Sequence, residues 1–543
     1  MPRAFAAFPS LSSACLWMAG ALALAGCGGG GGSSGSGSSG AVTISAGAGC
    51  QLSYTLTESP QLSGVDPQLD RQWHLRNTGQ TGGTPGEDMR ALEAWPATRG
   101  AGVRVAVIDD AVEVVHPDLR PNLVENASRS YRAGNRGSVW PVPCIAADDD
   151  HGTAVAGLVL ARDGNAVGGA GVAPRASLVA YDALASGQDA DIADALLRDG
   201  EENVIYQNSW GAPDDGALHP APTSFIQAIQ SGITNGRNGR GSIYVFPGGN
   251  GGCFARDSAG NCQADDANLD GFVNRLGVVT VCAVDDTGKR PYYGERGANL
   301  LVCAPSSGDT PNIGTTGLRG TQRTDFSGTS ASTPMVSGVV ALMLAANRSL
   351  TWRDVRLILA ETARRNDPTD PGWTSGPSGL AFNHKYGFGV VDAPAAVTRA
   401  ASWSSVGGSA GLRTCTVAER TPRIDIPDAP SSGPSTAVSD SVTVACDITR
   451  IEFVELRFTA THTYSGDLRV RLVSPGGTTS ELADARICLG SGSNPCGTFT
   501  DWSFGSSRHL GESAAGTWNL QVSDRAPLDT GRLERWSLRI HGR

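Results

Sequence analysis

The chain has 543 residues, a length that favours two to four domains at roughly 150 residues each. Hydrophobic residues make up 40% of the sequence, enough to build sizeable cores, so disorder throughout the chain is excluded. The formal net charge of −10 argues against nucleic acid as a partner. We therefore expect a multi-domain globular protein whose excess of carboxylates has a role unrelated to nucleic acid.

The N-terminus is typical of an export signal. Arg3 precedes an apolar stretch, Leu11–Ala25, which ends in small residues followed directly by Cys27. The pattern resembles a bacterial lipoprotein signal over 1–26, in which the Cys27 sulfur carries lipid and Cys27 becomes the mature N-terminus. An ordinary signal peptide followed by a chance cysteine is the alternative. Residues 27–65 begin as a Gly/Ser tether, so we expect an exported protein, lipid-anchored in a bacterial envelope at the outer membrane or cell surface.

The remaining cysteines favour disulfides. Without Cys15 in the signal and Cys27 at the anchor, ten of the 12 cysteines remain, an even number in an exported chain. No Cys/His spacing supports a zinc site. Sequence proximity suggests four pairs, and elimination leaves a fifth: Cys253–Cys262, Cys282–Cys303, Cys415–Cys446, Cys488–Cys496 and, last, Cys50–Cys144.

The middle of the chain alternates strands with helices. Helical stretches fall at about 152–162, 223–234 and 331–346. This alternation predicts an α/β domain over 66–402, with a mostly parallel sheet flanked by helices. Buried strands are expected at Val103–Ile108, Ser177–Tyr181, Val204–Tyr206, Ser242–Phe246 and Val278–Val284.

The pattern changes near residue 400. Residues 403–411 are rich in Gly and Ser and are expected to form a linker. Within them Gly407-Gly408-Ser409-Ala410-Gly411 fits the G-x-S-x-G elbow of hydrolases, but no strand precedes it, so we interpret it as chance. Short alternating segments over 412–543 predict an all-β, jelly-roll-like sandwich.

Three segments place reactive side chains where a strand ends or a helix begins. Asp109 follows a hydrophobic strand, His151 begins a helix, and Ser330 stands at the head of another helix. Strand ends of an open α/β sheet converge on one crevice. A serine hydroxyl becomes an effective nucleophile when a histidine takes its proton and a carboxylate orients that histidine.

The chain order Asp…His…Ser with these flanks resembles the subtilisin-like serine proteases. The resemblance implies that Asp109 orients, that His151 is general base and then general acid, and that Ser330 is the nucleophile. Phe246-Pro247-Gly248-Gly249-Asn250 matches the oxyanion loop of this family, which implies that the Asn250 amide donates to the tetrahedral oxyanion. The small residues around Ser330 leave room for a substrate backbone.

Finer matches resemble the kexin/furin branch of that family. The segment 209–216, which contains Ser209, Trp210 and Gly211, is close to the SWGPxDDG motif of the branch. The resemblance implies that Asp270 lies at the floor of the P1 pocket and Asp214 at its rim, and therefore that cleavage follows Arg or Lys.

Two further carboxylates, Asp110 and Asp148, fall where the branch has acids that face a basic P2 residue. For Asp110, Asp148 and Asp214 a loop-capping or surface role is the alternative. The acids of the branch for a P4 Arg would fall near Ile192 and Pro220, which are not acidic, so strict polybasic specificity is not expected.

The same resemblance implies Ca²⁺ as cofactor, which takes six to eight oxygen ligands. One site would combine two carboxylates with a loop, and a second would lie beside the P1 pocket. An EF-hand is excluded because Gly277 stands where that loop requires Glu. The implied ligands are Asp66, Asp118, the Asn165 side chain and the carbonyls of Arg162, Val167 and Gly169 in the first site, and Asp214, Asp265 and Glu295 in the second.

The C-terminal region resembles the P domain that follows kexin-type catalytic domains, as in His462-Thr463, Gly466-Asp467-Leu468 and Gly516-Thr517-Trp518. Its Trp502, Trp518 and Trp536 are interpreted as core aromatics, with a sugar platform as the alternative. Only 28–65 could hold a propeptide, so either folding needs none or a separate chaperone supplies the function.

The leading hypothesis is an exported, calcium-dependent serine endopeptidase that cleaves peptides and proteins after basic residues. A broad-specificity degradative subtilase is the rival within the enzyme class. A catalytically silent surface binding protein is the rival outside it.

Overall fold

A computed structural model describes residues 42–56, 63–146, 149–256, 260, 262–308, 311–490 and 494–543. The chain divides into two units, 1–41 and 42–543. The first unit, with the expected signal peptide, Cys27 and the Gly/Ser tether, lies outside the described residues.

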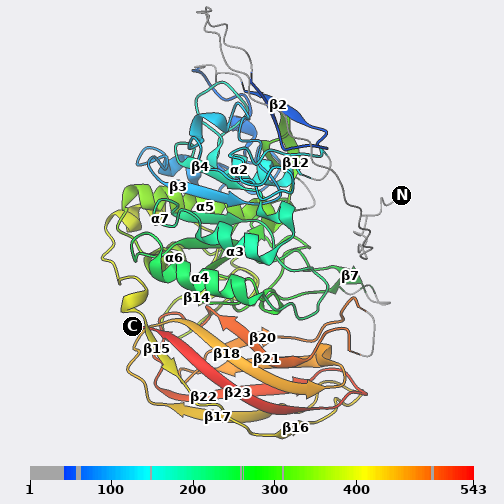
Figure 1. Cartoon of the computed structure of the whole chain (residues 1–543). Helices are drawn as coiled ribbons and strands as arrows, with labels where there is room; N and C mark the ends of the chain where they lie inside the picture. The colour runs from blue at the N-terminus through cyan, green and yellow to red at the C-terminus, as the bar shows by residue number, and fades with distance from the viewer. Residues whose placement is uncertain are drawn as a thin grey trace, which may run out of the picture. The chain divides into compact units, whose positions relative to one another are not determined.

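A six-stranded parallel sheet forms the centre of the α/β domain, in the order β10-β9-β6-β5-β3-β4. Its strands are apolar and almost wholly buried because helices cover the sheet, which confirms the predicted α/β class. Figure 1 shows these strands with helices packed around them. The strands are β3 (Arg104–Ile108), β4 (Ser177–Tyr181), β5 (Ile205–Asn208), β6 (Ile243–Pro247), β9 (Val278–Val284) and β10 (Val302–Pro305).

Helix α5 (Thr329–Ala346) is the central helix of this domain and packs against α2, α7 and strands β5, β6, β9 and β10. Among the described residues it is the one helix with the length and composition of a membrane span, but 83% of that window is buried inside the protein. It is therefore a core helix. The other helices are α1 (Ala91–Ala94), α2 (His151–Leu160), α3 (Asp189–Leu197), α4 (Thr223–Asn235), α6 (Trp352–Thr362) and α7 (Ala393–Ala401).

Short two-stranded hairpins of the α/β domain lie outside its central sheet. The pairs are β1 (Val42–Ser45) with β2 (Ser53–Leu56), β7 (Ala255–Arg256) with β8 (Cys262–Gln263), β11 (Ile313–Thr316) with β12 (Gln322–Phe326), and β13 (Thr374–Ser375) with β14 (Ala381–Phe382).

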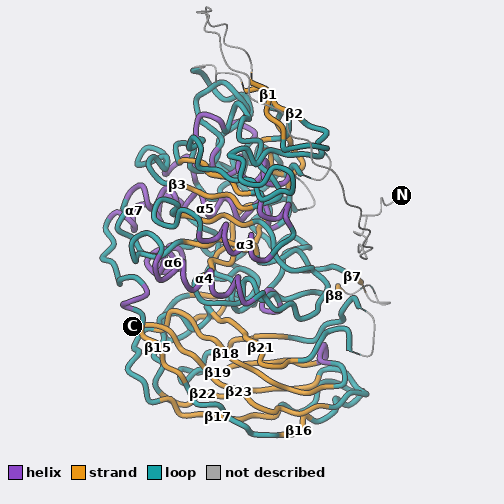
Figure 2. Tube along the Cα trace, viewed as in Figure 1, coloured by secondary structure: helices purple, strands orange, loops and turns teal. Residues whose placement is uncertain are grey.

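The C-terminal domain consists of two antiparallel sheets, as the sequence predicts. One has the order β15-β23-β18-β21, with β16 also paired to β23, and the other has the order β17-β22-β19-β20. Figure 2 shows this region built of strands, whereas the α-helices gather around β3–β10. The strands are β15 (Arg413–Thr416), β16 (Ile424–Ile426), β17 (Val438–Val444), β18 (Ile451–His462), β19 (Leu468–Val473), β20 (Thr479–Ala483), β21 (Phe499–Ser506), β22 (Gly516–Asp524) and β23 (Gly531–Gly542).

The three tryptophans of this domain are core residues. Trp518 and Trp536 are fully buried, and Trp502 donates from Nε1 to the Asn268 carbonyl of the α/β domain at 3.1 Å. Since none presents an exposed ring face, they do not form a sugar-binding platform.

The expected linker 403–411 is packed rather than loose. Trp403 Nε1 and the Val406 N–H both donate to Asp354 at 2.8 Å, at the start of α6. Ser409 lies in a 3₁₀ turn and donates to the Ile233 carbonyl at 2.5 Å, so it is no nucleophile elbow.

Polar contacts cross between the two domains within the described residues. The Asn268 side chain bonds both backbone groups of Gly505, at 3.0 and 2.7 Å. A Cβ at Gly505 would lie 2.5 Å from the Asn274 carbonyl oxygen, so only glycine fits there. Arg353 of α6 forms a buried ion pair with Glu452 of β18.

Four of the five expected disulfides are present: Cys50–Cys144, Cys253–Cys262, Cys282–Cys303 and Cys488–Cys496. The fifth prediction is wrong, because Cys415 and Cys446 remain thiols. Cys415 lies on β15 and Cys446 follows β17, strands of opposite sheets whose ends bring the sulfurs near without joining them. Burial and the neighbouring Cys446 raise the pKa of the Cys415 thiol to about 12.

Candidate active site

Asp109 and His151 lie in direct contact at the end of β3. Asp109 follows the last residue of this strand and is 1% exposed, while His151 is the first residue of α2. His151 Nδ1 lies 2.8 Å from Asp109 Oδ1. Burial alone would lower the pKa of His151, but the Asp109 carboxylate outweighs it and raises the pKa to about 9. The carboxylate therefore orients the ring and stabilises its cationic form.

Ser330 is the second residue of α5, so its hydroxyl lies at the N-terminus of this core helix. Its Oγ donates to the Ser209 carbonyl at 3.2 Å, and Ser209 Oγ donates back to the Ser330 carbonyl at 3.0 Å. Phe326, four residues earlier, packs edge-on against the His151 ring with centroids 5.3 Å apart. Phe326 thus connects the segment that leads into α5 with the imidazole.

The Asn250 side chain is fixed by α5. Asn250 follows β6, and its Oδ1 accepts from the Thr329 N–H at 2.8 Å and from Thr329 Oγ1 at 2.9 Å. Because the carbonyl end is engaged, the Nδ2 amide is the donor left over. Gly328, with φ of 78°, makes this approach possible, since a Cβ there would lie 3.1 Å from Asn250 Oδ1. The sequence motifs do not indicate that Thr329 orients the Asn250 amide.

Asp270 lies against Gly211, where a Cβ would come within 2.7 Å of Asp270 Oδ2. Its carboxylate accepts from the N–H groups of Ala212 at 3.0 Å and Phe272 at 2.6 Å. Burial raises its pKa to about 6, and these donors limit the rise. Asp270 and Asp214 line the same small cavity. The structure therefore brings together the two acids expected at the P1 pocket.

Trp210 is held by its neighbours. Its Nε1 donates to the Ile108 carbonyl at 3.0 Å, and its ring packs edge-on against Phe225, Phe246 and Phe272. It thus braces the segment Ser209–Gly211 between β3 and the aromatic cluster.

Asp110 caps helix α2. Its Oδ1 accepts from the Gly152 N–H at 2.8 Å, and its Oδ2 accepts from the His151 N–H at 3.2 Å. Burial, with the neighbouring charge of Asp109, raises its pKa to about 8. This geometry is that of the loop-capping alternative. Asp148, its expected companion, lies outside the described residues.

The loop 162–169 meets Asp66 and Asp118. Asp66 accepts from the N–H groups of Gly164 at 2.8 Å and Asn165 at 3.0 Å, and Asn165 Nδ2 donates to Asp118 Oδ1 at 2.9 Å. Asp118 Oδ2 is buried without a partner. Burial, with the nearby charge of Asp66, raises the pKa of Asp118 to about 8. Arg162, Val167 and Gly169 lie on this loop, as the sequence predicts.

Asp214, Asp265 and Glu295 meet around the Gly249–Gly251 segment. Glu295 accepts from the Gly251 N–H at 2.9 Å, and Asp214 accepts from the Asn250 N–H at 3.0 Å. Burial, with the charges of Asp265 and Asp214, raises the pKa of Glu295 well above its usual range. Among the described residues no three His, Cys, Asp or Glu side chains are arranged as a closed metal cluster.

A loop of the β-sandwich domain supports the segment that carries Asp214. Arg486 Nε donates to the Gly216 carbonyl at 2.6 Å, and the Leu489 N–H donates to the Asp215 carbonyl at 2.8 Å. Gly216 has a φ of 80°, and a Cβ there would lie 2.5 Å from the Ile487 carbonyl oxygen. The sequence carries no signal for this contact, since Gly216 and Arg486 are 270 residues apart.

The fold and this geometry agree with a comparison to known families. Residues 100–389 match the family model described as Subtilase family, more than half of the chain. The chain belongs to the subtilase family of serine endopeptidases. Residues 451–540 match the model described as Proprotein convertase P-domain, which identifies the β-sandwich as a P domain.

Similar proteins are convertase-like endoproteases. A PC3-like endoprotease (variant B) of Hydra vulgaris is 34% identical over 479 residues, which cover 86% of this chain and 64% of that protein. A dibasic-processing endoprotease of Schizosaccharomyces pombe is 35% identical over 492 residues, covering 88% and 65%. The chain thus spans a little under two thirds of either relative.

A solved structure supports the two-domain arrangement. The serine protease of Aeromonas sobria, in complex with its chaperone, superposes with a TM-score of 0.76 at 26% identity. The match covers 89% of this chain and 96% of that protease. Both domains of the present chain are therefore found together in one bacterial protease.

Proposed function

We propose that this chain is an endopeptidase that cleaves after basic residues by way of an acyl-enzyme on Ser330. The contact that carries the proposal is the 2.8 Å hydrogen bond between Asp109 and His151, whose ring packs against Phe326, four residues before Ser330. A buried carboxylate on Nδ1 leaves Nε2 as the basic nitrogen, which suits it to take a hydroxyl proton.

In the first step Ser330 Oγ leaves the Ser209 carbonyl, gives its proton to His151 Nε2 and attacks the scissile carbonyl carbon. The oxyanion then receives hydrogen bonds from Asn250 Nδ2, whose orientation Thr329 fixes, and from the Ser330 N–H. His151 returns the proton to the leaving amine, and the C–N bond breaks. Water, deprotonated by the same ring, then hydrolyses the Ser330 ester.

The preference for a basic P1 residue is supported by Asp270. Its carboxylate lies at the small cavity that Asp214 and Ala212 also line. A cationic side chain entering there would pair with a buried carboxylate, whereas an apolar one would leave that charge unpaired.

Asp270→Asn tests this preference. We expect the variant to lose on the order of 10²-fold or more in kcat/KM for an Arg-P1 peptide. The loss with the same peptide carrying Leu at P1 should be small. Equal losses on both peptides would instead favour the broad degradative subtilase.

Ca²⁺ is the cofactor that the first loop site fits best. Among the described residues the buried Asp118 Oδ2 has no hydrogen-bond partner, and burial with the nearby charge of Asp66 raises the pKa of Asp118, so a cation would stabilise both carboxylates. Asp66, Asp118, the Asn165 side chain and the carbonyls of 162, 167 and 169 would hold the ion, and Asp214, Asp265 and Glu295 a second one. Bound Ca²⁺ would supply the charge that keeps these carboxylates ionised and their loops together.

A chelator tests both calcium sites. We expect EDTA to lower the melting temperature of the wild-type chain and to have a smaller effect on Asp118→Asn. An unchanged melting temperature after chelation would rule out both sites.

Export and lipid anchoring on Cys27 are proposed from residues 1–40 alone. A separate folding chaperone is supported by the Aeromonas sobria protease, whose structure was solved with one. Labelling of Cys27 by a radioactive fatty acid, lost in Cys27→Ser, would test the anchor.

A further inference from the structure

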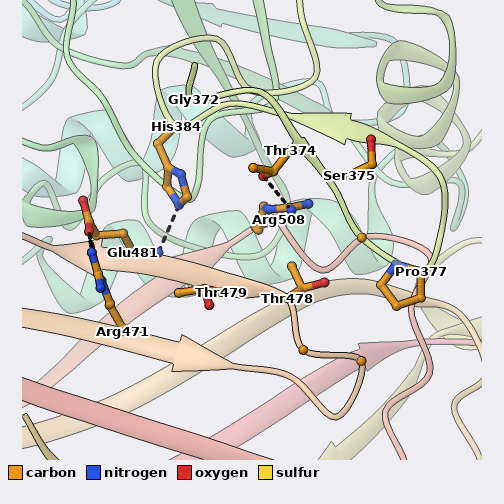
Figure 3. A pocket seen from close by; sticks show the side chains of 13 residues that line it. Gly372, Thr374, Ser375, Pro377, His384, Arg471, Thr478, Thr479, Glu481 and Arg508 are labelled. Atoms are coloured by element: carbon orange, nitrogen blue, oxygen red, sulfur yellow. Dashed lines mark hydrogen bonds and ion pairs between the residues drawn. The ribbon is translucent and has the colours of Figure 1, made fainter. Parts of the chain in front are cut away.

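A cavity of about 570 Å³ opens between the α/β domain and the P domain (Figure 3). One wall is the β13–β14 hairpin with its flanking residues, and the other is the β19–β20 hairpin with Arg508, which follows β21. None of the residues that line this cavity belongs to the candidate active site or to the expected calcium sites. The cavity therefore needs an explanation of its own.

Arg508 is the unusual residue of the cavity. It is 5% exposed, and its Nη2 donates to Thr374 Oγ1 at 2.9 Å. Its Nε is buried and has no partner, and within the described residues no carboxylate lies within 4.0 Å of its guanidinium nitrogens. The guanidinium lies over the Phe382 ring, 5.6 Å from the centroid. An arginine that keeps its charge is thus buried against a hydroxyl and an aromatic ring.

Arg353 is a buried arginine between the two domains that is paired with a carboxylate. Arg353 donates to both oxygens of Glu452, at 2.8 and 2.6 Å, and also to backbone carbonyls. Arg296 forms ion pairs with Asp266 and Glu481. Arg486 and Arg356 are also buried and form no ion pair within the part of the chain that the structure describes. They donate instead to the carbonyls of Gly216 and Val278, respectively. Among the described residues Arg508 has neither a paired carboxylate nor a backbone carbonyl as acceptor. Since a buried charge without a counter-charge is costly, Arg508 points to a counter-ion from outside the chain.

The acids near the cavity form no ion pair with Arg508 among the described residues. Glu481 binds Arg471 at 2.9 Å in addition to Arg296. Glu512 lies close behind the wall, where its Oε2 accepts from Ser474 Oγ at 2.6 Å and its Oε1 is buried without a hydrogen-bond partner from the described ranges. The ring of His384 accepts the Glu481 N–H at 3.0 Å on Nε2, and burial holds its pKa at about 3, so it is neutral. The charge of Glu512 acts on Arg508 from more than 4.0 Å, and burial still lowers the pKa of Arg508, so its charge is only partly compensated.

The cavity also offers hydroxyl donors. Figure 3 shows the Arg508 guanidinium between Thr374 on one side and Thr478 on the other, with Ser375 and Thr479 nearby. Guanidinium groups bind carboxylate, sulfate and phosphate oxygens through parallel N–H donors, and hydroxyls complete such a shell.

We propose that this cavity binds an oxyanion, a carboxylate, sulfate or phosphate group, through Arg508. Such a ligand would contact the α/β domain through Thr374 and the P domain through Thr478 and Arg508. Its binding would therefore hold the two domains together, independently of peptide hydrolysis.

The test is calorimetric titration of the full exported chain with sodium sulfate, and separately with sodium acetate, at constant ionic strength set by chloride. We expect saturable binding of at least one of these anions, sulfate identifying a tetrahedral and acetate a planar ligand. Arg508→Gln should weaken binding at least tenfold. Arg539→Gln, an exposed arginine of β23 outside the cavity, is the matched control and should bind as the wild type does.

The same affinity in Arg508→Gln and wild type, or no saturable binding of either anion to the wild-type chain, would overturn the proposal. Should Arg508→Gln fail to fold, a crystal of the wild-type chain soaked in selenate gives the answer. An anomalous peak within hydrogen-bond distance of Arg508 supports the site. The absence of a peak there overturns it.

Discussion

The buried ion pair between Arg353 and Glu452 predicts a large loss of stability when one partner is removed. Arg353, on α6, is fully buried and donates to both oxygens of Glu452, at 2.8 and 2.6 Å. In Arg353→Met the carboxylate stays buried while its main counter-charge is lost. Removing one member of such a pair costs about 3–5 kcal/mol. Arg543, 3.7 Å from Glu452, replaces part of the lost attraction, so we expect the lower end of this range.

Urea unfolding followed by tryptophan fluorescence measures this loss. Arg413→Met is the control, since its pair with Asp447 is exposed on both sides and should contribute roughly 0–1 kcal/mol. The double variant Arg353→Met, Glu452→Gln should recover much of the stability, because no buried charge remains unpaired. A loss in Arg353→Met no larger than in Arg413→Met would show that the buried pair does not stabilise the fold.

Three further predictions concern the site. Asn250→Leu should lower kcat by about 10²–10³ with little change in KM, measured by steady-state hydrolysis; an unchanged kcat would remove Asn250 from the oxyanion hole. Asp109→Asn should move the rising limb of the kcat/KM–pH profile to lower pH. The reason is that Asp109 raises the pKa of His151, and the ring must be neutral to act as base. A rising limb that stays in place would contradict this. Arg486→Gln should raise KM for an Arg-P1 peptide more than it lowers kcat, because Arg486 supports the segment that carries Asp214. Arg486→Lys should restore the KM. Equal effects on a peptide with Leu at P1 would indicate a merely structural role.

The sequence alone predicted the site residues whose position is set by one strand or one helix. Asp109 stands at the end of a hydrophobic strand and His151 at the start of a helix, so their meeting follows from the parallel sheet. Strand β10 is not among the predicted strands, because it ends in Pro305, and proline within a short run is typical of a turn or of an edge strand.

Contacts between distant segments could not be predicted from short sequence patterns. Proximity in the sequence suggested a Cys415–Cys446 bond, but it could not reveal that the two sulfurs lie at the ends of opposite sheets. The packing of 403–411 onto Asp354 and the capping of α2 by Asp110 likewise depend on the tertiary fold. The cavity at Arg508 exists only where two domains meet, so no single segment signals it.

Cleavage of two peptides that differ only at P1 tests both the nucleophile Ser330 and the preference for a basic P1 residue. With the wild-type chain we expect a much larger kcat/KM for Arg at P1 than for Leu, and we expect no hydrolysis of either peptide by Ser330→Ala. Retained turnover in Ser330→Ala would contradict the assignment of the nucleophile. Equal rates on the two peptides would contradict the basic P1 pocket.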